Sequence, residues 1–211
     1  MRTPIGAMLT DLVHSDERED VIVEIRDEPV TELAQHGSIS IAFEVDRLLE
    51  VLTPEGGIGG ITLRERIVEH PYAKDYDAIK GEGPQRWLTR FDLKNCGLKA
   101  AYVDGKRVGG AVIAFDTPGI YLLDDRNDLA ELWDLRVEPA MRGMGVGRSL
   151  FLAAEQWARE RRCTQLQVET QNVNVSACHF YLRMGCELRG IDRFAYPDLP
   201  TEVRLLWLKN L

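Results

Sequence analysis

Hydrophobic and polar positions alternate along several short stretches of the chain, a pattern typical of half-buried β-strands. In the first part of the chain this pattern predicts strands at residues 21–25 and 39–45, the latter running on into 48–52. Residues 98–103 and 107–115 are also strand-like, and the Asp104-Gly105 pair between them is a strong turn signal, so we expect a hairpin there. Later strands are expected at residues 132–137, 164–169, 187–195 and 203–209.

Helical spacing of apolar residues separates some of these strands. Helices are expected at residues 62–70, 84–91, 149–161 and 176–184. Pro71 would end the first helix, and Pro84 would occupy the first turn of the second, where its missing N–H costs nothing. Asn174 precedes the last helix closely and is a candidate N-cap.

The order of elements from about residue 98 is a hairpin, then strand–helix–strand–helix, then two strands, which predicts a mixed α/β sheet. The chain of 211 residues is long enough to bury a real core. Residues 1–20 are polar and acidic and are expected to be an N-terminal arm. A single domain is therefore assigned to residues 21–211, with a mobile glycine-rich linker at 56–60.

A cluster of glycines follows the strand expected at residues 132–137. The run is Arg142-Gly-Met-Gly-Val-Gly147, with three glycines at alternate positions behind an arginine. Where a strand, a glycine turn and a helix N-terminus meet, backbone N–H groups point outward and favour a phosphate group. The run lacks the Lys-Ser/Thr pair of a P-loop and the Gly-x-Gly-x-x-Gly spacing of a dinucleotide-binding turn. The spacing therefore indicates another phosphate-bearing cofactor.

A second motif occupies residues 174–186, Asn-Val-Ser-Ala-Cys-His-Phe-Tyr-Leu-Arg-Met-Gly-Cys. Together with residues 142–147 it resembles the GNAT superfamily of N-acetyltransferases, in which the glycine loop binds the pyrophosphate of acyl-CoA. Cys186 stands where that family usually has phenylalanine, a departure that affects packing more than chemistry. Residues 169–178 and 190–196 look similar to streptothricin acetyltransferases in particular. The resemblance covers about residue 98 to the C-terminus.

The resemblance implies the acetyltransferase (GNAT) fold, an α/β fold in which the mixed central sheet is flanked by helices and splays between its two central strands. The pantetheine of acetyl-CoA would lie in that gap and pair with main-chain groups of Leu135 and Val137. Arg142 and Arg148 would add charge–phosphate pairing to the N–H groups of the loop. The residues expected to bind the cofactor are Leu135, Arg136, Val137, Arg142, Gly143, Met144, Gly145, Val146, Gly147, Arg148, Ser149, Asn174, Ala177 and Tyr181.

Acetyl transfer to an amine needs a base, because a protonated amine has no lone pair. The resemblance implies Glu169 as that base, at the end of the strand that faces the cofactor. Asp134 is the second candidate, although an ion pair with a basic neighbour explains it equally well. Tyr181 would protonate the departing thiolate, with core packing as the alternative. Asn174 would bond the cofactor, although helix capping explains it nearly as well.

Strand alternation places Trp133, Leu135 and Val137 on one face of their strand and Asp134 and Arg136 on the other. None of the cysteines is arranged as a nucleophile, so the amine is expected to attack the thioester directly.

Composition restricts the kinds of binding partner expected for the chain. The net charge of −8 opposes nucleic-acid binding and suits a cationic substrate, although solubility alone also explains it. None of the apolar runs approaches the roughly 20 residues that span a bilayer, and the N-terminus is a poor signal peptide, so a cytoplasmic protein without membrane association is expected. The four cysteines lack metal or redox spacing, so neither a metal nor a disulfide is expected.

These observations favour an acetyl-CoA-dependent N-acetyltransferase that acts on a primary amine. The acceptor would be a streptothricin-like antibiotic or another small amine, with a protein N-terminus of the ribosomal-protein type as an alternative. A non-catalytic acyl-CoA-binding regulatory module and a nucleotide-dependent enzyme are the further alternatives. Acceptor specificity is assigned to about residues 55–95, and a homodimer is left open.

Overall fold

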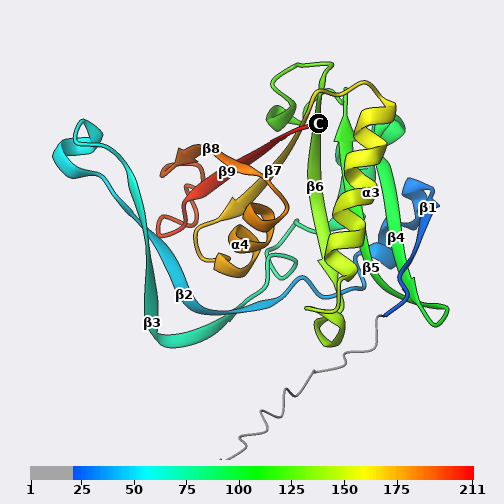
Figure 1. Cartoon of the computed structure of the whole chain (residues 1–211), viewed down its shortest axis with the longest axis horizontal. Helices are drawn as coiled ribbons and strands as arrows, with labels where there is room; N and C mark the ends of the chain where they lie inside the picture. The colour runs from blue at the N-terminus through cyan, green and yellow to red at the C-terminus, as the bar shows by residue number, and fades with distance from the viewer. Residues whose placement is uncertain (1–20) are drawn as a thin grey trace, which may run out of the picture.

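The chain is built around a seven-stranded sheet in the order β1-β4-β5-β6-β7-β9-β8 (Figure 1). The structure, a computed structural model, describes residues 21–211, and the arm expected at residues 1–20 lies outside them. The strands of the sheet are β1 (Glu24–Glu28), β4 (Gly97–Val103), β5 (Lys106–Phe115), β6 (Leu129–Val137), β7 (Gln165–Gln171), β8 (Glu187–Asp192) and β9 (Arg204–Asn210). Neighbouring strands are antiparallel except β6 and β7, which are parallel. The predicted mixed α/β sheet is confirmed.

Helices cover both faces of the sheet (Figure 1). They are α1 (Leu33–His36), α2 (Pro84–Arg90), α3 (Val146–Glu160) and α4 (Val175–Arg183). Side chains of β5 point alternately to the two faces of the sheet, and their contacts show which helices cover each face. Ala111 and Ile113 join the core under α3, whereas Val112 joins Leu33 of α1 and Trp87 of α2. Buried side chains of α4 belong to the α3 core, so α3 and α4 share one face.

The two central strands part soon after they begin. β6 and β7 pair only at Leu129–Gln165, Ala130–Leu166 and Glu131–Gln167. Beyond Glu131 and Gln167 each strand continues without bonding to the other, so the sheet opens into a gap at the C-terminal ends of both. The predicted splay between the central strands is confirmed, and it places the ends of two parallel strands on either side of a space large enough for a ligand.

A bulge in β6 changes which side chains face this space. The pairing with β5 shifts between Val112–Asp134 and Ile113–Leu132, so Trp133 is an extra residue on β6. Trp133 stacks on Trp87, with ring centroids 4.5 Å apart, and therefore lies on the same face as Asp134. The prediction that Trp133 shares a face with Leu135 was wrong, because simple alternation does not hold across a bulge.

Residues 43–74 form a long hairpin outside the main sheet, made of β2 (Phe43–Leu52) and β3 (Thr62–Lys74). It crosses beneath α4 and then extends away from the body (Figure 1). The helix predicted at 62–70 was wrong, and β3 continues through Pro71 because that proline lies in an irregular stretch that does not pair with β2. The expected linker at 56–60 is the hairpin turn.

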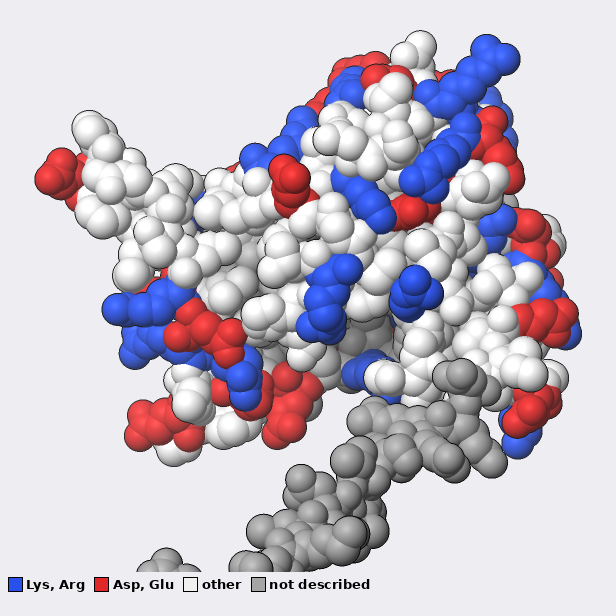
Figure 2. Space-filling model, in the orientation of Figure 1, with Lys and Arg blue, Asp and Glu red and all other residues white. Residues whose placement is uncertain are grey.

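The hairpin is more exposed than the rest of the fold. Charged residues of both signs are mixed along its stem, and its tip is mostly uncharged (Figure 2). Ile58 at the tip is 92% exposed. The remaining predicted elements agree with the structure within a few residues at their ends, and Asp104 and Gly105 form the β4–β5 turn with positive φ. Within residues 21–211, none of the helices is long and apolar enough to cross a membrane.

Candidate active site

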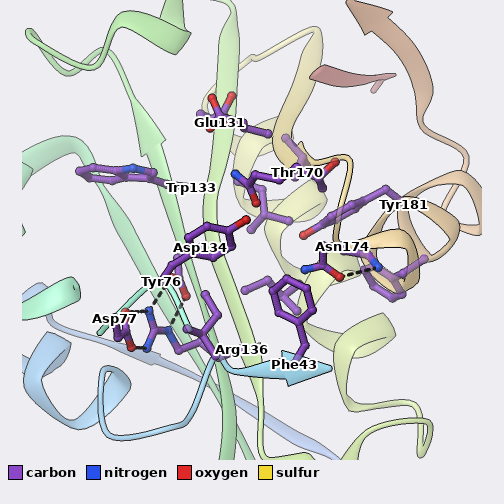
Figure 3. Close-up of a pocket in the computed structure, with 18 of the residues that line it drawn as sticks. Phe43, Tyr76, Asp77, Glu131, Trp133, Asp134, Arg136, Thr170, Asn174 and Tyr181 are labelled. Atoms are coloured by element: carbon purple, nitrogen blue, oxygen red, sulfur yellow. Dashed lines mark hydrogen bonds and ion pairs between the residues drawn. The ribbon is translucent and has the colours of Figure 1, made fainter. Parts of the chain in front are cut away.

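The gap between β6 and β7 opens into a cavity of about 1590 Å³. Its walls come from both strands, the glycine loop, the start of α4, the base of the hairpin and two loops that carry residues 119–122 and 195–202. Figure 3 shows Phe43 and Glu131 at opposite ends of the drawn part of this cavity, with Tyr181 reaching in from α4. The candidates for catalysis, Glu169, Asp134 and Tyr181, all line it.

The glycine loop forms one end of the cavity and is suited to an anion. Gly143 and Gly145 have φ values of 81° and 87°, and around a Cβ added at either position nothing lies within 4 Å. Helix α3 begins after Gly145 without a side-chain cap, so the N–H groups of its first turn are free for a ligand. Arg148 is exposed and makes no ion pair within residues 21–211. These features fit the pyrophosphate of a CoA thioester.

Main-chain groups of β6 face the gap next to this loop. The N–H of Glu138 donates to the carbonyl of Val108 at 2.8 Å, and bonded pairs alternate with unbonded ones along antiparallel strands. Leu135 and Val137 therefore occupy unbonded positions and direct their N–H and C=O groups away from β5, toward β7. The carbonyl of Val137 accepts from Arg142 Nε at 3.1 Å. The main chain around Leu135 remains suited to the amides of pantetheine.

Arg142 lines the cavity, but its guanidinium already donates hydrogen bonds to three main-chain carbonyls. Besides the Val137 carbonyl, it donates to the carbonyls of Ala42 at 2.9 Å and Ser40 at 3.1 Å. Burial lowers the pKa of Arg142, although an arginine stays charged. Its pairing with a phosphate stays a prediction, and only the N–H groups left over from these three bonds are free to make it.

Asn174 and Tyr181 come from the second motif and meet the cavity from α4. Asn174 caps the helix, because its Oδ1 accepts from the N–H of Ala177 at 3.1 Å (Figure 3). Capping uses only the oxygen, so the amide nitrogen is left for the cofactor. Tyr181 is buried against Phe151 and Phe180, and its hydroxyl points toward the gap (Figure 3). Burial raises the pKa of Tyr181, so the phenol is protonated at neutral pH.

Glu169 lies at the far side of the gap, on the face of β7 opposite α4. Its Oε1 accepts from the hydroxyl of Tyr196 at 2.7 Å, and its Oε2 lies 3.4 Å from the hydroxyl of Tyr121. Arg204 is the only cation near it in the described part of the chain, at 3.8 Å. Burial raises the pKa of Glu169, against the hydrogen bond from Tyr196 and the charge of Arg204. A carboxylate with a raised pKa suits a general base.

Asp134 is paired on both oxygens. His36 of α1 lies 2.8 Å from its Oδ1, and Arg136 donates to both oxygens at 2.8 Å. Arg136 also reaches Asp77 at 2.6 Å, so one buried guanidinium joins two carboxylates. Burial alone would raise the pKa of Asp134, but the hydrogen bonds from Arg136 and His36 outweigh it and lower the pKa to about 2. This pairing makes Asp134 a weaker base than Glu169.

Glu131 was not found from the sequence. It is 1% exposed, lines the cavity and occupies the last paired position before the gap opens. Gln167 and the backbone of Glu169 are nearby polar groups, but neither bonds to its carboxyl oxygens with good geometry. Burial raises the pKa of Glu131 well above the usual glutamate value. The one available signal was a lone acidic residue inside the otherwise apolar run Leu129-Ala-Glu-Leu-Trp133.

Most residues assigned to the cofactor from the sequence meet at this cavity. The exceptions are Met144, which is exposed, Val146, the buried first residue of α3, and Ser149, one turn into α3. Arg136 lines the cavity, but its guanidinium is committed to the two aspartates. The segment 55–95 contributes Tyr76, Asp77 and parts of the stretch up to Phe91, including α2, whereas the hairpin tip does not reach the cavity.

Comparison with known proteins agrees with this geometry. The Acetyltransferase (GNAT) family matches residues 64–186. A streptothricin acetyltransferase of Escherichia coli is 32% identical over 151 residues, which are 70% of this chain and 75% of that protein. The crystal structure of nourseothricin acetyltransferase superposes with a TM-score of 0.70 at 28% identity, covering 89% of this chain and 98% of the other.

A second solved structure is described as a putative streptothricin acetyltransferase from Bacillus anthracis str. Ames in complex with acetyl coenzyme A. It superposes with a TM-score of 0.69 at 25% identity, over 90% of this chain and 100% of the other. The family match covers more than half of the chain and includes both the glycine loop and the second motif at residues 174–186. The chain therefore belongs to the GNAT family and is an acetyl-CoA-dependent N-acetyltransferase.

Proposed function

We propose that the acceptor is a primary amine on a small cationic molecule of the streptothricin type. The observation that carries this proposal is the excess of carboxyl groups on the acceptor side of the cavity. Glu44 and Asp198 line its rim and make no ion pair within residues 21–211, while Glu131 and Glu169 lie deeper. Carboxylates without cationic partners attract and orient an ammonium group. The streptothricin acetyltransferase relatives support the same class.

Aromatic side chains strengthen this preference. Tyr76, Tyr121, Trp133 and Tyr196 line the same region of the cavity. The faces of aromatic rings attract cations, and the attraction grows when water is excluded. Together with the carboxyl groups, they favour an acceptor that carries positive charge over a neutral amine or an acidic peptide.

The proposed roles in donor binding and proton transfer are divided between the two sides of the gap. On the α3 side, the main chain near Leu135, the loop N–H groups and Arg148 would hold acetyl-CoA, which supplies an acyl thioester. On the opposite side, Glu169 would accept a proton from the ammonium form of the acceptor, so that its nitrogen attacks with a free lone pair. Tyr181 would donate its phenolic proton to the departing sulfur from the α4 side. The proposed base and the proposed acid therefore belong to opposite faces of the sheet.

Glu131 is the second candidate for the base, supported by its position at the start of the gap. Burial raises the pKa of Glu131 and leaves its charged form without a hydrogen-bond partner among residues 21–211, whereas Glu169 has two hydroxyl groups that stabilise the charged form. We therefore assign the proton transfer to Glu169.

Single isosteric substitutions separate the two glutamates. Glu169→Gln is expected to lower kcat by about 100-fold or more, the usual contribution of a general base. Glu131→Gln is expected to lower kcat less, with the main effect on the KM of the amine. Steady-state release of CoA thiol with saturating acetyl-CoA measures both. The assignment is reversed if Glu131→Gln has the larger effect on kcat.

A protein N-terminus is the alternative to a small amine as acceptor. An amine panel distinguishes them: streptothricin, spermidine and a peptide with an N-terminal alanine, each with acetyl-CoA. Transfer to the peptide alone would favour the N-terminal acetyltransferase. Binding of CoA with transfer to none of the amines would contradict the proposed acceptor class.

A further inference from the structure

Strand β2 runs across the open end of the gap between β6 and β7. Its first residues lie beside the glycine loop that follows β6, and its middle lies beside the end of β7 and α4 (Figure 1). We propose that β2 is a bridge between the two walls of the gap, anchored by Arg142 and Asn172. Through these positioning residues, the loop that holds the donor also holds the wall that meets the acceptor.

The first anchor is Arg142. Its three nitrogens donate to carbonyls of Ser40, Ala42 and Val137, two in the segment that leads into β2 and one at the end of β6. Hydrogen bonds from a charged group are stronger than neutral ones, at roughly 1.5–3 kcal/mol each. A single guanidinium therefore joins the start of β2 to the β6 wall, directly beneath the glycine loop.

The second anchor is Asn172, just past the end of β7. Its side-chain nitrogen donates to the Leu49 carbonyl at 3.0 Å, and its own carbonyl accepts from the Leu49 N–H at 2.9 Å. Its Oδ1 accepts from the N–H of Val203 at 2.8 Å, and only 4% of the residue is exposed. The middle of β2 is thus joined to the β7 wall by two reciprocal bonds.

Part of β2 between the anchors lines the cavity. Phe43, Glu44 and Asp46 lie on β2 between Ala42 and Leu49, and all of them line the acceptor side. A two-stranded hairpin is marginally stable by itself in water, so its place depends on such attachments. The position of the acceptor wall therefore depends on Arg142 as well as on Asn172.

In this arrangement Arg142 would contact both a phosphate and the segment before β2, whereas Arg148 would contact a phosphate alone. A phosphate on the glycine loop would attract Arg142 and fix the guanidinium further, and its carbonyl bonds would pass that restraint to residues 40–42. Arg148 lies in the first turn of α3, just after the loop, and makes no bond to the hairpin within residues 21–211. The two arginines are therefore a matched pair for testing the bridge.

Hydrogen exchange on the protein without ligands tests the anchors directly. Arg142→Ala is expected to speed amide exchange across residues 40–49 by about tenfold or more, the equivalent of one lost charged hydrogen bond. Arg148→Ala should leave that exchange as in the wild type. Asn172→Asp keeps the acceptor for Val203 but removes the donor to Leu49, so it should also speed exchange at residues 46–52. Circular dichroism confirms that each variant is folded.

Kinetics give the second readout, which rests on the proposed amine acceptor. Arg142→Ala should raise the KM of both acetyl-CoA and the amine, whereas Arg148→Ala should raise only that of acetyl-CoA. Exchange in residues 40–49 that is equal in the two arginine variants would overturn the bridge. Because the exchange measurement contains no acceptor, it decides the matter even if no amine in the panel is acetylated.

Discussion

The hydroxyl of Tyr196 donates a hydrogen bond to Glu169 Oε1 at 2.7 Å, and Gln171 fixes its direction. The side-chain nitrogen of Gln171 donates to the same hydroxyl oxygen at 3.1 Å, so the phenolic hydrogen is left to point at the carboxylate. Tyr121 is set in the same way, because Arg204 donates to its oxygen at 3.1 Å. The base proposed for the reaction is thus held by two oriented phenols.

Removing the Tyr196 hydroxyl should shift the pH dependence of catalysis. The hydrogen bond lowers the pKa of Glu169 against the opposing effect of burial, so Tyr196→Phe should raise that pKa further. Since Glu169 must be ionised to accept a proton, the acidic limb of the kcat/KM profile should move to higher pH. Tyr121→Phe, which removes the longer bond, should give a smaller shift. An unchanged acidic limb in Tyr196→Phe would argue against Glu169 as the base.

Glu131 should make stability depend on pH. A buried carboxyl whose folded pKa lies above its unfolded value stabilises the fold only while protonated, so stability falls as pH rises from the ordinary glutamate pKa toward the raised one. Glu131→Gln should therefore have a higher Tm than the wild type at pH 8 and a nearly equal one at pH 4. Thermal unfolding at both pH values measures this. A variant that is less stable at pH 8 would show that the carboxylate has a partner.

Asp134 should be needed for stability more than for proton transfer. Asp134→Asn removes the carboxylate beside His36 and leaves the buried Arg136 with Asp77 alone, which should cost about 3 kcal/mol of unfolding free energy at pH 7. The same contribution is present above the ordinary aspartate pKa and is lost as pH falls toward about 2. Denaturant unfolding measures the loss. Full stability with abolished turnover would instead support a catalytic Asp134.

Gly145 should be needed for the donor rather than for the fold. Its φ of 87° makes alanine strained by roughly 1–2 kcal/mol, and the added methyl group would project into the open space beside the loop. Gly105 in the β4–β5 turn has a φ of 72° and equally open surroundings, so Gly105→Ala matches the strain without touching the cavity. Calorimetry should show weaker acetyl-CoA binding for Gly145→Ala only. Equal affinity in both variants would place the phosphates elsewhere.

Local signals explain why the C-terminal half of the fold could be predicted. The Asp104-Gly105 turn, the glycine loop and the Asn174 cap each depend on a few adjacent residues. β3 was predicted as a helix because its charged stem residues have no core face to alternate with, and its partner β2 lies ten residues back across a turn. A strand in a solvated hairpin leaves little pattern in its own sequence.

The site was predictable to a similar extent. The motifs place Glu169, Tyr181 and the glycine loop at one cavity, because the end of β7, the inner face of α4 and the start of α3 meet there. The bulge at Trp133, the contact of Asp134 with α1 and the buried position of Glu131 depend on contacts between distant segments. Such contacts leave no local signal.

Product analysis with two competing acceptors tests whether the protein acetylates a cationic small amine. The purified protein is incubated with acetyl-CoA and equal concentrations of streptothricin and an alanine-ended peptide, and the products are identified by mass spectrometry. The proposed site predicts one acetyl group on streptothricin, CoA released in equal amount, and an unmodified peptide. Acetylation of the peptide with streptothricin unchanged would contradict the proposal.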